Sequence, residues 1–445
     1  MSIYDAAQRL GRSFVLFQSG AFLLSVGTRC HQIAVAWWVL DSTSSPSIFA
    51  AFVAIAGAAE VISRPIFGWM GDFYNRKRCF LTINLIGLGA ALGCALLALF
   101  ALFQSYLVAA LLVILGIVAG IRDPLSASIL PALVSRDQVS LAVQTRTLFV
   151  SIAMLIGPAI AGALLATQGV TFALLANVFA LLVSTILISR VRIPSNQSAA
   201  AEKEPATYLR QWSRKISSGF VVLYRVKTEW YLALLAMGVN LCLYPLFGVL
   251  VPVLVKDELN TSPLVMSILD AAFCAGMLLG SGLLVKQVNR RVGRARGVYA
   301  GFFALGASLI LTSLLSLQKL DLSVMQIIVL IVPAMLIGGV GLTLVNVNTA
   351  TVRTLATPDA FRNRMMATVS FFVGLTIPIG SALAGQLSDW CGAPRTIGLL
   401  GLFIVFLAVI CPLIPGLKHV MQTREEELGD KYLELYPSAF SARGT

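Results

Sequence analysis

Two carboxylates stand inside long apolar stretches of the chain, where ionisable side chains are rare. Glu60 lies in AIAGAAEVISRPIFG, two helical turns before Gly68, and Asp270 lies in SILDAAFCAGMLLGSG, three turns before Gly282. A charge at the centre of a membrane is costly unless it faces a cavity or a partner, so both residues are functional candidates. Each could carry a proton or hold a cationic substrate, and the alternative is a structural pair with a nearby arginine.

Further polar side chains stand in the same apolar surroundings. They are Arg29, His31, Arg122, Asp123, Asn240, Asn346 and Asn348. His31 could titrate near neutral pH, and Arg29 could contact an anionic substrate or neutralise Glu60. The adjacent Arg122 and Asp123 could neutralise each other or line a cavity. The asparagines suit hydrogen bonds to a substrate or between helices. With the two carboxylates, these residues form the predicted set for substrate binding or proton coupling.

The elements that position these side chains are predicted to be membrane-spanning helices. Hydrophobic residues make up 58% of the 445 and charged residues 12%, and the mean hydropathy is +0.87. A soluble domain carries about 25% charged residues, so lipid is the expected surroundings of this chain. Each apolar stretch is about 20 residues long and matches the hydrocarbon core of a bilayer. The twelve predicted spans are 14–40, 48–71, 79–103, 105–130, 140–166, 170–190, 229–254, 263–286, 297–317, 322–351, 365–388 and 395–415.

The positive charges predict the orientation of these helices. The connections alternate between a short set with few cations and a basic set, and only Lys256, Lys319 and Arg395 fall in the first set. Basic loops stay in the cytoplasm, so both termini are expected on the cytoplasmic side. The expected location of the protein is the inner membrane of a bacterium. On a soluble protein the net charge of +13 would indicate nucleic acid, but the loop pattern accounts for it and no nucleic-acid partner is expected.

The predicted fold is an all-α membrane protein of two pseudo-symmetric six-helix bundles. The expected parts are a first bundle at 1–190, a cytoplasmic linker with a basic amphipathic helix at 191–228, a second bundle at 229–417 and a cytoplasmic tail at 418–445. The tail is charged, and no function is assigned to it. The seven cysteines show no CxxC or CxxH spacing, so neither a disulfide framework nor a zinc site is implied. No metal and no cofactor is predicted.

A short pattern recurs after the second predicted helix of each half. The first copy, in GWMGDFYNRKR, contains Gly68, Asp72, Arg76 and Lys77. The second copy, in GLLVKQVNRR, contains Gly282, Lys286, Arg290 and Arg291 at the same spacing. The matching places indicate a duplicated six-helix unit, as in many transporter folds. The alternative is that both are ordinary basic loops.

The first copy resembles the loop signature between helices 2 and 3 of the major facilitator superfamily. Asn75 stands where that signature has glycine, a tolerable exchange because asparagine also accepts left-handed backbone angles. The resemblance implies a conformational latch in which the carboxylate pairs with nearby cations in one state and separates in the other. The latch residues are Gly68, Asp72, Arg76 and Lys77. Lys286 replaces the acid in the second copy, so a second latch is expected to be weaker or absent.

The fifth predicted helix carries IGPAIAGALL, which is similar to the antiporter motif of drug-exporting branches of that superfamily. Its motif residues are Gly157, Pro158 and Gly162. The proline could bend the helix and the glycines allow close helix packing. The motif could therefore serve either in gating or only in helix packing. The first span and the segment SGFVVLYRVKTEW look like the twelve-helix branch that includes macrolide and siderophore exporters.

These features together predict a secondary transporter and not an enzyme. No G-x4-G-K-[ST] pattern occurs in the chain, so ATP is not expected to drive it directly. We expect a monomer in the lipid bilayer that exports a small molecule, a drug-like compound or a siderophore, in exchange for protons by alternating access. The alternatives are a lipid or nutrient transporter of the same fold, or a membrane sensor that transports nothing.

Overall fold

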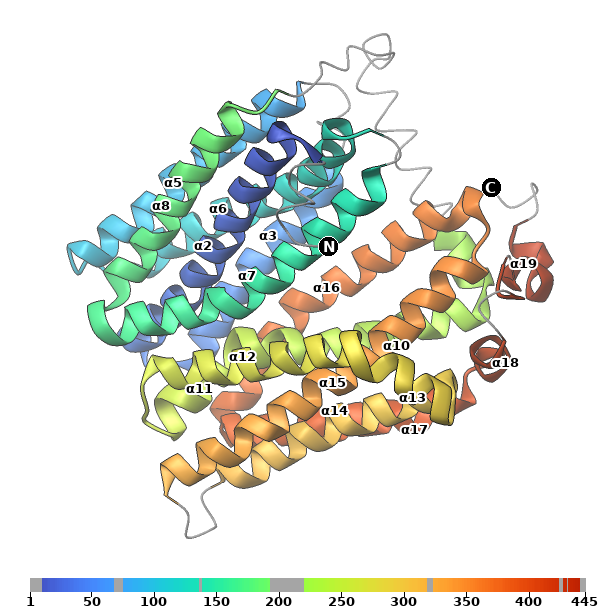
Figure 1. Cartoon of the computed structure of the whole chain (residues 1–445). Helices are drawn as coiled ribbons and strands as arrows, with labels where there is room; N and C mark the ends of the chain where they lie inside the picture. The colour runs from blue at the N-terminus through green and yellow to red at the C-terminus, as the bar shows by residue number, and fades with distance from the viewer. Residues whose placement is uncertain are drawn as a thin grey trace. The chain divides into compact units, whose positions relative to one another are not determined.

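The computed structural model describes a helical protein. It covers residues 10–67, 75–135, 138–192, 220–317, 323–423, 427–429 and 431–440. Within these ranges the chain forms helices and turns and no strand. Figure 1 shows the helices in chain order.

The first half of the chain contains six long helices at the predicted places. They are α2 (Arg12–Thr43), α3 (Pro46–Phe67), α5 (Arg76–Leu99), α6 (Ser105–Ile129), α7 (Val139–Gln168) and α8 (Val170–Ser189). A single residue, Gly169, separates α7 from α8 with a φ of 81°. That angle is disfavoured for residues with a Cβ atom, so glycine suits this tight reversal.

The second half also follows the predicted spans, with two helices interrupted by π-helical turns. Its long helices are α10 (Lys227–Pro245), α12 (Pro263–Leu279), α14 (Arg294–Ser316), α15 (Val324–Ala356), α16 (Asp359–Cys391) and α17 (Ala393–Ile410). α10 continues through α11 (Val251–Val253) to Glu258, and α12 continues into α13 (Val285–Val292). At the turn after α12, the Thr343 hydroxyl of α15 donates to the carbonyl of Met277, as polar side chains do where a membrane helix widens.

Ten of the described helical stretches are long and apolar enough to cross a membrane. α12 is shorter, with 17 residues, and α2 is long but is not among the ten. Large apolar side chains such as Leu85 and Ile86 are exposed on the helices, which suits contact with lipid. The protein is therefore a multi-pass membrane protein, and the count of twelve spans stays a prediction.

Residue contacts divide the chain into two compact units. Unit 1 comprises Met1–Glu202, Phe247–Ala271 and Ser381–Asp389, and unit 2 comprises Lys203–Leu246, Ala272–Gly380 and Trp390–Thr445. Short segments of the second half of the chain thus pack with the first six helices in unit 1. The predicted division into two bundles at a linker stays a prediction. Most of that linker, including the larger part of its expected amphipathic helix, lies outside the described residues, and 220–225 are helical.

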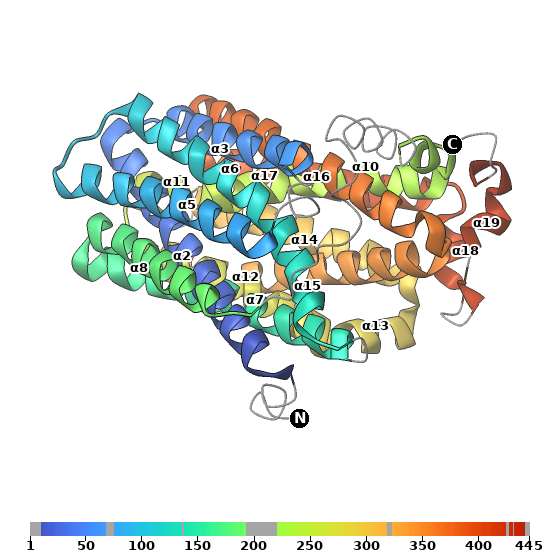
Figure 2. The same cartoon turned by 90° about the horizontal axis from the view of Figure 1, so that it is seen from above.

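Small residues allow the helices of unit 1 to approach closely. α2 packs against α8 and α7, while α3 packs against α6, and Figures 1 and 2 show α2 and α8 side by side. A Cβ atom on Gly116 of α6 would lie 2.3 Å from the carbonyl oxygen of Ala56 on α3. Without a strong hydrophobic force between helices in lipid, such close packing is a main source of their association.

In unit 2, small residues likewise allow close packing between α14 and its neighbours α15 and α17. Gly301 and Gly341 face each other across α14 and α15, where an added Cβ atom on either would lie 2.6 Å from the other's carbonyl oxygen. Gly306 and Gly401 form a similar close contact between α14 and α17.

Candidate functional site

Asp270 and Arg29 form the first of two charged groups in unit 1. Asp270 lies on α12 and Arg29 on α2, and the positive charge of Arg29 acts on the Asp270 carboxylate. The Oδ1 atom of Asp270 is buried and has no hydrogen-bond partner among the described residues. Arg29 itself makes a weak contact from Nη1 to Gln32 Oε1, 3.3 Å away. The carboxylate therefore keeps an oxygen free for a proton, a water molecule or a ligand.

The predicted motif of the fifth helix packs against both helices that carry this pair. A Cβ atom on Gly157 of α7 would lie 2.8 Å from the Cβ of Arg29. On Gly162 it would lie 2.2 Å from the hydroxyl oxygen of Ser267 and 3.2 Å from the Cα of Leu264 on α12. The glycines thus let α2 and α12 approach α7, and α7 runs as one helix through Pro158.

Ser267 belongs to this site, although sequence analysis did not select it. Its hydroxyl is buried and has no partner among the described residues. It precedes Asp270 by three residues, so the two side chains share one face of α12. The i to i+3 spacing was visible in the sequence, but serine is too common in membrane helices to stand out alone.

The second charged group surrounds Glu60. Arg64 Nη2 lies 2.5 Å from Glu60 Oε1 on the same helix and 3.4 Å from Asp123 Oδ2 on α6. The positive charge of Arg122 also acts on Glu60. The two negative charges of Glu60 and Asp123 are thus matched by the two positive charges of Arg64 and Arg122. Arg64, and not Arg29, is thus the partner of Glu60. The i to i+4 spacing of Glu60 and Arg64 was a signal that pointed to this pair.

α3 and α6 meet closely at this second group. A Cβ atom on Gly120 of α6 would lie 2.0 Å from the Ser63 hydroxyl oxygen and 2.3 Å from the Glu60 carbonyl oxygen. The Ser63 hydroxyl also donates to the carbonyl of Glu60, 2.9 Å away. The side chain of Asp123 is 61% exposed, so solvent or lipid headgroups screen its part of the group.

The remaining predicted residues are His31 on α2, Asn240 on α10, and Asn346 and Asn348 on α15. His31 is buried on α2, and neither ring nitrogen has a partner among the described residues. Asn240 Nδ2 donates to Ala236 O within α10. Asn348 is buried and joins α15 to α13, accepting a 2.8 Å bond from Asn289. The Asn346 side chain is exposed on α15.

Half of the predicted latch lies within the described residues. Gly68 and Asp72 fall outside them, while Arg76 and Lys77 form the first turn of α5. Asn75 is extended, with φ −62° and ψ 109°, and its Oδ1 accepts from the Lys77 and Arg78 amides at 3.1 Å. Asn75 does not use the left-handed angles that glycine and asparagine both accept. Asparagine suits this position because it caps the N-terminus of a helix.

A third set of contacts in unit 1 joins segments that are far apart in the sequence. Lys256 Nζ lies 3.0 Å from Asp41 Oδ1 and 5.6 Å from the centre of the Trp37 ring. The Ser47 amide donates to Asp389 Oδ1, 3.3 Å away. Sequence analysis placed these residues near loops and had no reason to pair them, because the pairing spans more than 200 residues.

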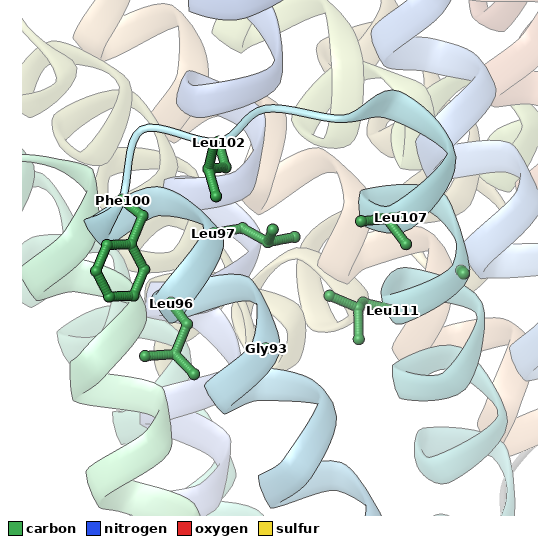
Figure 3. Close-up of a pocket in the computed structure, with 8 residues that line it drawn as sticks. Gly93, Leu96, Leu97, Phe100, Leu102, Leu107 and Leu111 are labelled. Atoms are coloured by element: carbon green, nitrogen blue, oxygen red, sulfur yellow. The ribbon is translucent and has the colours of Figure 1, made fainter.

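A groove of about 310 Å³ lies beside the turn between α5 and α6 (Figure 3). Its lining is Gly93, Leu96, Leu97, Phe100, Leu102, Leu107, Ala110 and Leu111. None of these side chains can orient a polar molecule by hydrogen bonds, so the groove suits a hydrocarbon chain of the bilayer better than a transported polar solute. In the described parts of the chain, no group of three or more His, Cys, Asp or Glu side chains is arranged to hold a metal ion.

Comparison with known proteins places this geometry in a family. A family model described as a transmembrane secretion effector matches residues 13–435. The macrolide efflux protein A of Streptococcus pyogenes is 23% identical over 408 residues, which cover 92% of this chain and 97% of that protein. The staphyloferrin A transporter of Staphylococcus aureus is 22% identical over 397 residues, covering 88% of this chain and 94% of that protein.

Solved structures show the same fold at lower sequence identity. A bacterial homologue of the human lysosomal transporter Spinster, in an inward-facing and unoccupied conformation, has a TM-score of 0.70 at 14% identity. The match covers 92% of this chain and 97% of that one. A peptide transporter in complex with sulfate also has a TM-score of 0.70, at 13% identity, over 92% of this chain and 96% of that one.

Proposed function

Because the chain belongs to the transmembrane secretion effector family of major facilitator transporters, we propose that it exports a small molecule in exchange for protons. Transport is the activity of the family, and the chain is a transporter and not an enzyme. The finer proposal is a monomer of twelve spans with both termini in the cytoplasm of a bacterium, working by alternating access.

The unpartnered oxygen of Asp270 is the observation that carries this proposal. A buried carboxylate whose free oxygen has no partner among the described residues can take up a proton or a ligand without first breaking a bond. When the carboxylate is charged, Arg29 is its counter-ion. When it is neutral, the arginine is available to an anionic group of the substrate. Binding at one partner can thus change the state of the other, which is what coupling requires.

The close contacts around this pair support a link between its charge and helix movement. Because Gly162 has no side chain, α7 approaches Ser267 so closely that a methyl group would not fit between them. A change in the charge or ligand of Asp270, one turn away on α12, acts next to that contact. Small shifts there would be transmitted because packed helices move as rigid elements.

The contacts of Lys256 with Asp41 and of Ser47 with Asp389 support alternating access. They join α2 and α3 of the first half to segments of the second half within unit 1. In the predicted orientation they lie on the side away from the cytoplasm. An exporter must open that side to release its substrate, so these contacts are expected to break once in each cycle.

The named relatives indicate two substrate classes, a macrolide and a siderophore. We propose that the substrate is drug-like or siderophore-like and carries at least one charged group. Arg29 suits a carboxylate of a siderophore, and Asp270 suits the amine of a cationic drug. Glu60 is a less suitable contact because Arg64 and Arg122 already neutralise it.

Growth and secretion assays in an exporter-deficient bacterium test the proposal. Cells expressing the wild type, Asp270→Asn or Glu60→Gln at equal protein levels would be challenged with macrolides, other antibiotics and dyes, and their medium analysed for secreted siderophore. We expect the wild type and Glu60→Gln to export one class and Asp270→Asn to fail. Export that survives Asp270→Asn would remove the proposed role of that carboxylate. No export of any compound would favour an importer or a sensor.

A further inference from the structure

The C-terminal tail, which sequence analysis left without a role, folds against unit 2. It forms α18 (Leu417–Gln422), α19 (Lys431–Leu435) and a short turn at Pro437–Ala439 (Figure 1). Several of its apolar side chains are buried, among them Leu417, Val420, Leu428 and Tyr432, while Leu433 is exposed. The described residues of the tail are therefore part of the packed structure.

A buried carboxylate connects the tail to two membrane helices. Glu229, in the first turn of α10, is 0% exposed. Its Oε1 accepts a hydrogen bond from Nε of Arg353, in the last turn of α15. Its Oε2 accepts from the Tyr432 hydroxyl of α19 at 2.9 Å. Each carboxylate oxygen thus has a partner, and one of the two partners belongs to the tail.

The Tyr432 hydroxyl is suited to remain a donor. The ring is fully buried, and burial, with the nearby Glu229 carboxylate as the next cause, raises the pKa of Tyr432 well above its usual range. The phenol therefore keeps its proton at any physiological pH. Loss of the hydroxyl would leave one oxygen of a buried carboxylate without a partner, which is more costly than the loss of an exposed hydrogen bond.

A second contact lies beside the first. The Thr228 hydroxyl is 2.7 Å from the Pro415 carbonyl oxygen and 2.7 Å from the Tyr436 hydroxyl. Gly416 allows this approach, because its φ is +73° and a Cβ atom would lie 2.7 Å from the Thr228 hydroxyl oxygen. Two adjacent residues of α10 are thus bonded to two tyrosines of the tail that are one helical turn apart.

The tail also contacts α14 and α16. Arg294, the first residue of α14, donates from Nη2 to the Thr423 carbonyl at 2.9 Å. Phe361, in the first turn of α16, packs edge-on against Phe440 with ring centres 5.2 Å apart. These contacts, with those of Glu229, place the tail on the starts of α10, α14 and α16 and the end of α15.

We propose that the described residues of the C-terminal segment, 415–423, 427–429 and 431–440, form a clasp that makes these four helix ends move as one body during transport, with Tyr432 as its positioning residue. Tyr432 acts through Glu229, which it holds in place against Arg353. The proposal requires that the chain is a transporter but does not depend on the direction, the substrate or the role of Asp270. A segment bonded to several helix ends at once links their movements, and the tail makes such contacts with these four ends.

Amide hydrogen exchange of the purified full chain tests the clasp without a substrate. The variants are Tyr432→Phe, Glu229→Gln and the control Glu434→Gln, which changes an α19 side chain that is 63% exposed. For Tyr432→Phe we expect exchange to rise by roughly tenfold, the ratio that one lost buried bond implies, at the starts of α10, α14 and α16 and the end of α15 together. Glu434→Gln should leave all four ends unchanged.

Faster exchange confined to 417–440 would overturn the proposal. It would show that the tail lies against the four helix ends without linking their movements. Efflux of a labelled macrolide, normalised to folded protein, gives a second readout. We expect Tyr432→Phe and Glu229→Gln each to lower the maximal rate several-fold at unchanged KM, with the double variant no worse than either single one. If the chain moves no macrolide, the proposed function fails on that substrate while the exchange data still decide on the clasp.

Discussion

Glu60 and Asp270 each lie on the second predicted helix of their half, at different distances from the repeated glycine, and their surroundings in unit 1 differ. Glu60 has an arginine one turn away on its own helix and belongs to a group of four charges that balance. Asp270 has Arg29 as its charged neighbour and keeps one buried oxygen without a partner among the described residues. Carboxylates on corresponding helices of the two halves therefore need not share one chemistry, because their charged neighbours differ.

The difference suggests two roles. A balanced group of charges holds α3 to α6 and changes little when a proton or ligand arrives. An incompletely paired carboxylate can respond to either, so it is the better candidate for coupling.

Asp270→Asn is expected to lower transport more than tenfold, whereas Glu60→Gln should stay within about threefold of the wild type. The amide keeps the shape of the carboxylate but can neither release a proton nor pair with Arg29. Efflux per folded molecule would be measured with equal protein in the membrane. Equal losses in the two variants would show that the carboxylates share one role.

Arg29→Gln is expected to lower both transport and thermal stability, because it leaves the Asp270 carboxylate without a counter-ion. The stability loss should be about 1–3 kcal/mol, as for other buried groups that lose a partner. The double variant Arg29→Gln/Asp270→Asn should recover most of the stability but not the transport. A double variant as unstable as the single one would mean that the two residues do not interact.

Gly162→Ala and Gly120→Ala compare the helix contacts of the two groups. Added methyl groups would lie 2.2 Å and 2.0 Å from serine hydroxyl oxygens, so each variant should lose about 1–3 kcal/mol of stability from overpacking. Only Gly162→Ala should also reduce transport per folded molecule, because it separates α7 from α12. Gly89→Ala, where the space around the residue is open, is the matched control and should be neutral in both assays.

Asp123→Asn is expected to have the smallest effect. Its side chain is 61% exposed and lies 3.4 Å from Arg64, and exposed ion pairs contribute about 0–1 kcal/mol. Transport within about twofold of the wild type, at an unchanged melting temperature, would agree with a screened structural contact. A large loss of transport would place this carboxylate in the substrate path and weaken the contrast with Asp270.

The two copies of the sequence repeat show how far a pattern determines local structure. In the first copy Asn75 caps α5, and the cations Arg76 and Lys77 lie in its first turn. In the second copy Arg290 and Arg291 lie in the last turn of α13, and the next helix begins only after Gly293. The spacing is the same in both copies, but the helix boundary falls on opposite sides of the cations.

The positions of the helices and the family of the chain could both be predicted from the amino-acid sequence. Every predicted span coincides with a helix, from α2 at Arg12–Thr43 to α17 at Ala393–Ile410, because span length and apolar content are local properties set by the thickness of the bilayer. The resemblance to major facilitator transporters rested on short motifs in single segments, and it is confirmed by the family match over residues 13–435.

Which polar groups have partners depends on the packing of the helices, and it could not be predicted from the sequence. Arg64 was within reach of Glu60 along one helix, but the electrostatic effect of Arg29 on Asp270 acts between residues more than 200 positions apart. The contact of Tyr432 with Glu229 also links distant parts of the chain. Nothing in the tail's own sequence indicates that contact, so from its residues alone it was predicted only to be a charged segment. A polar side chain in a membrane protein takes its role from its neighbours in space, and those depend on how whole helices pack.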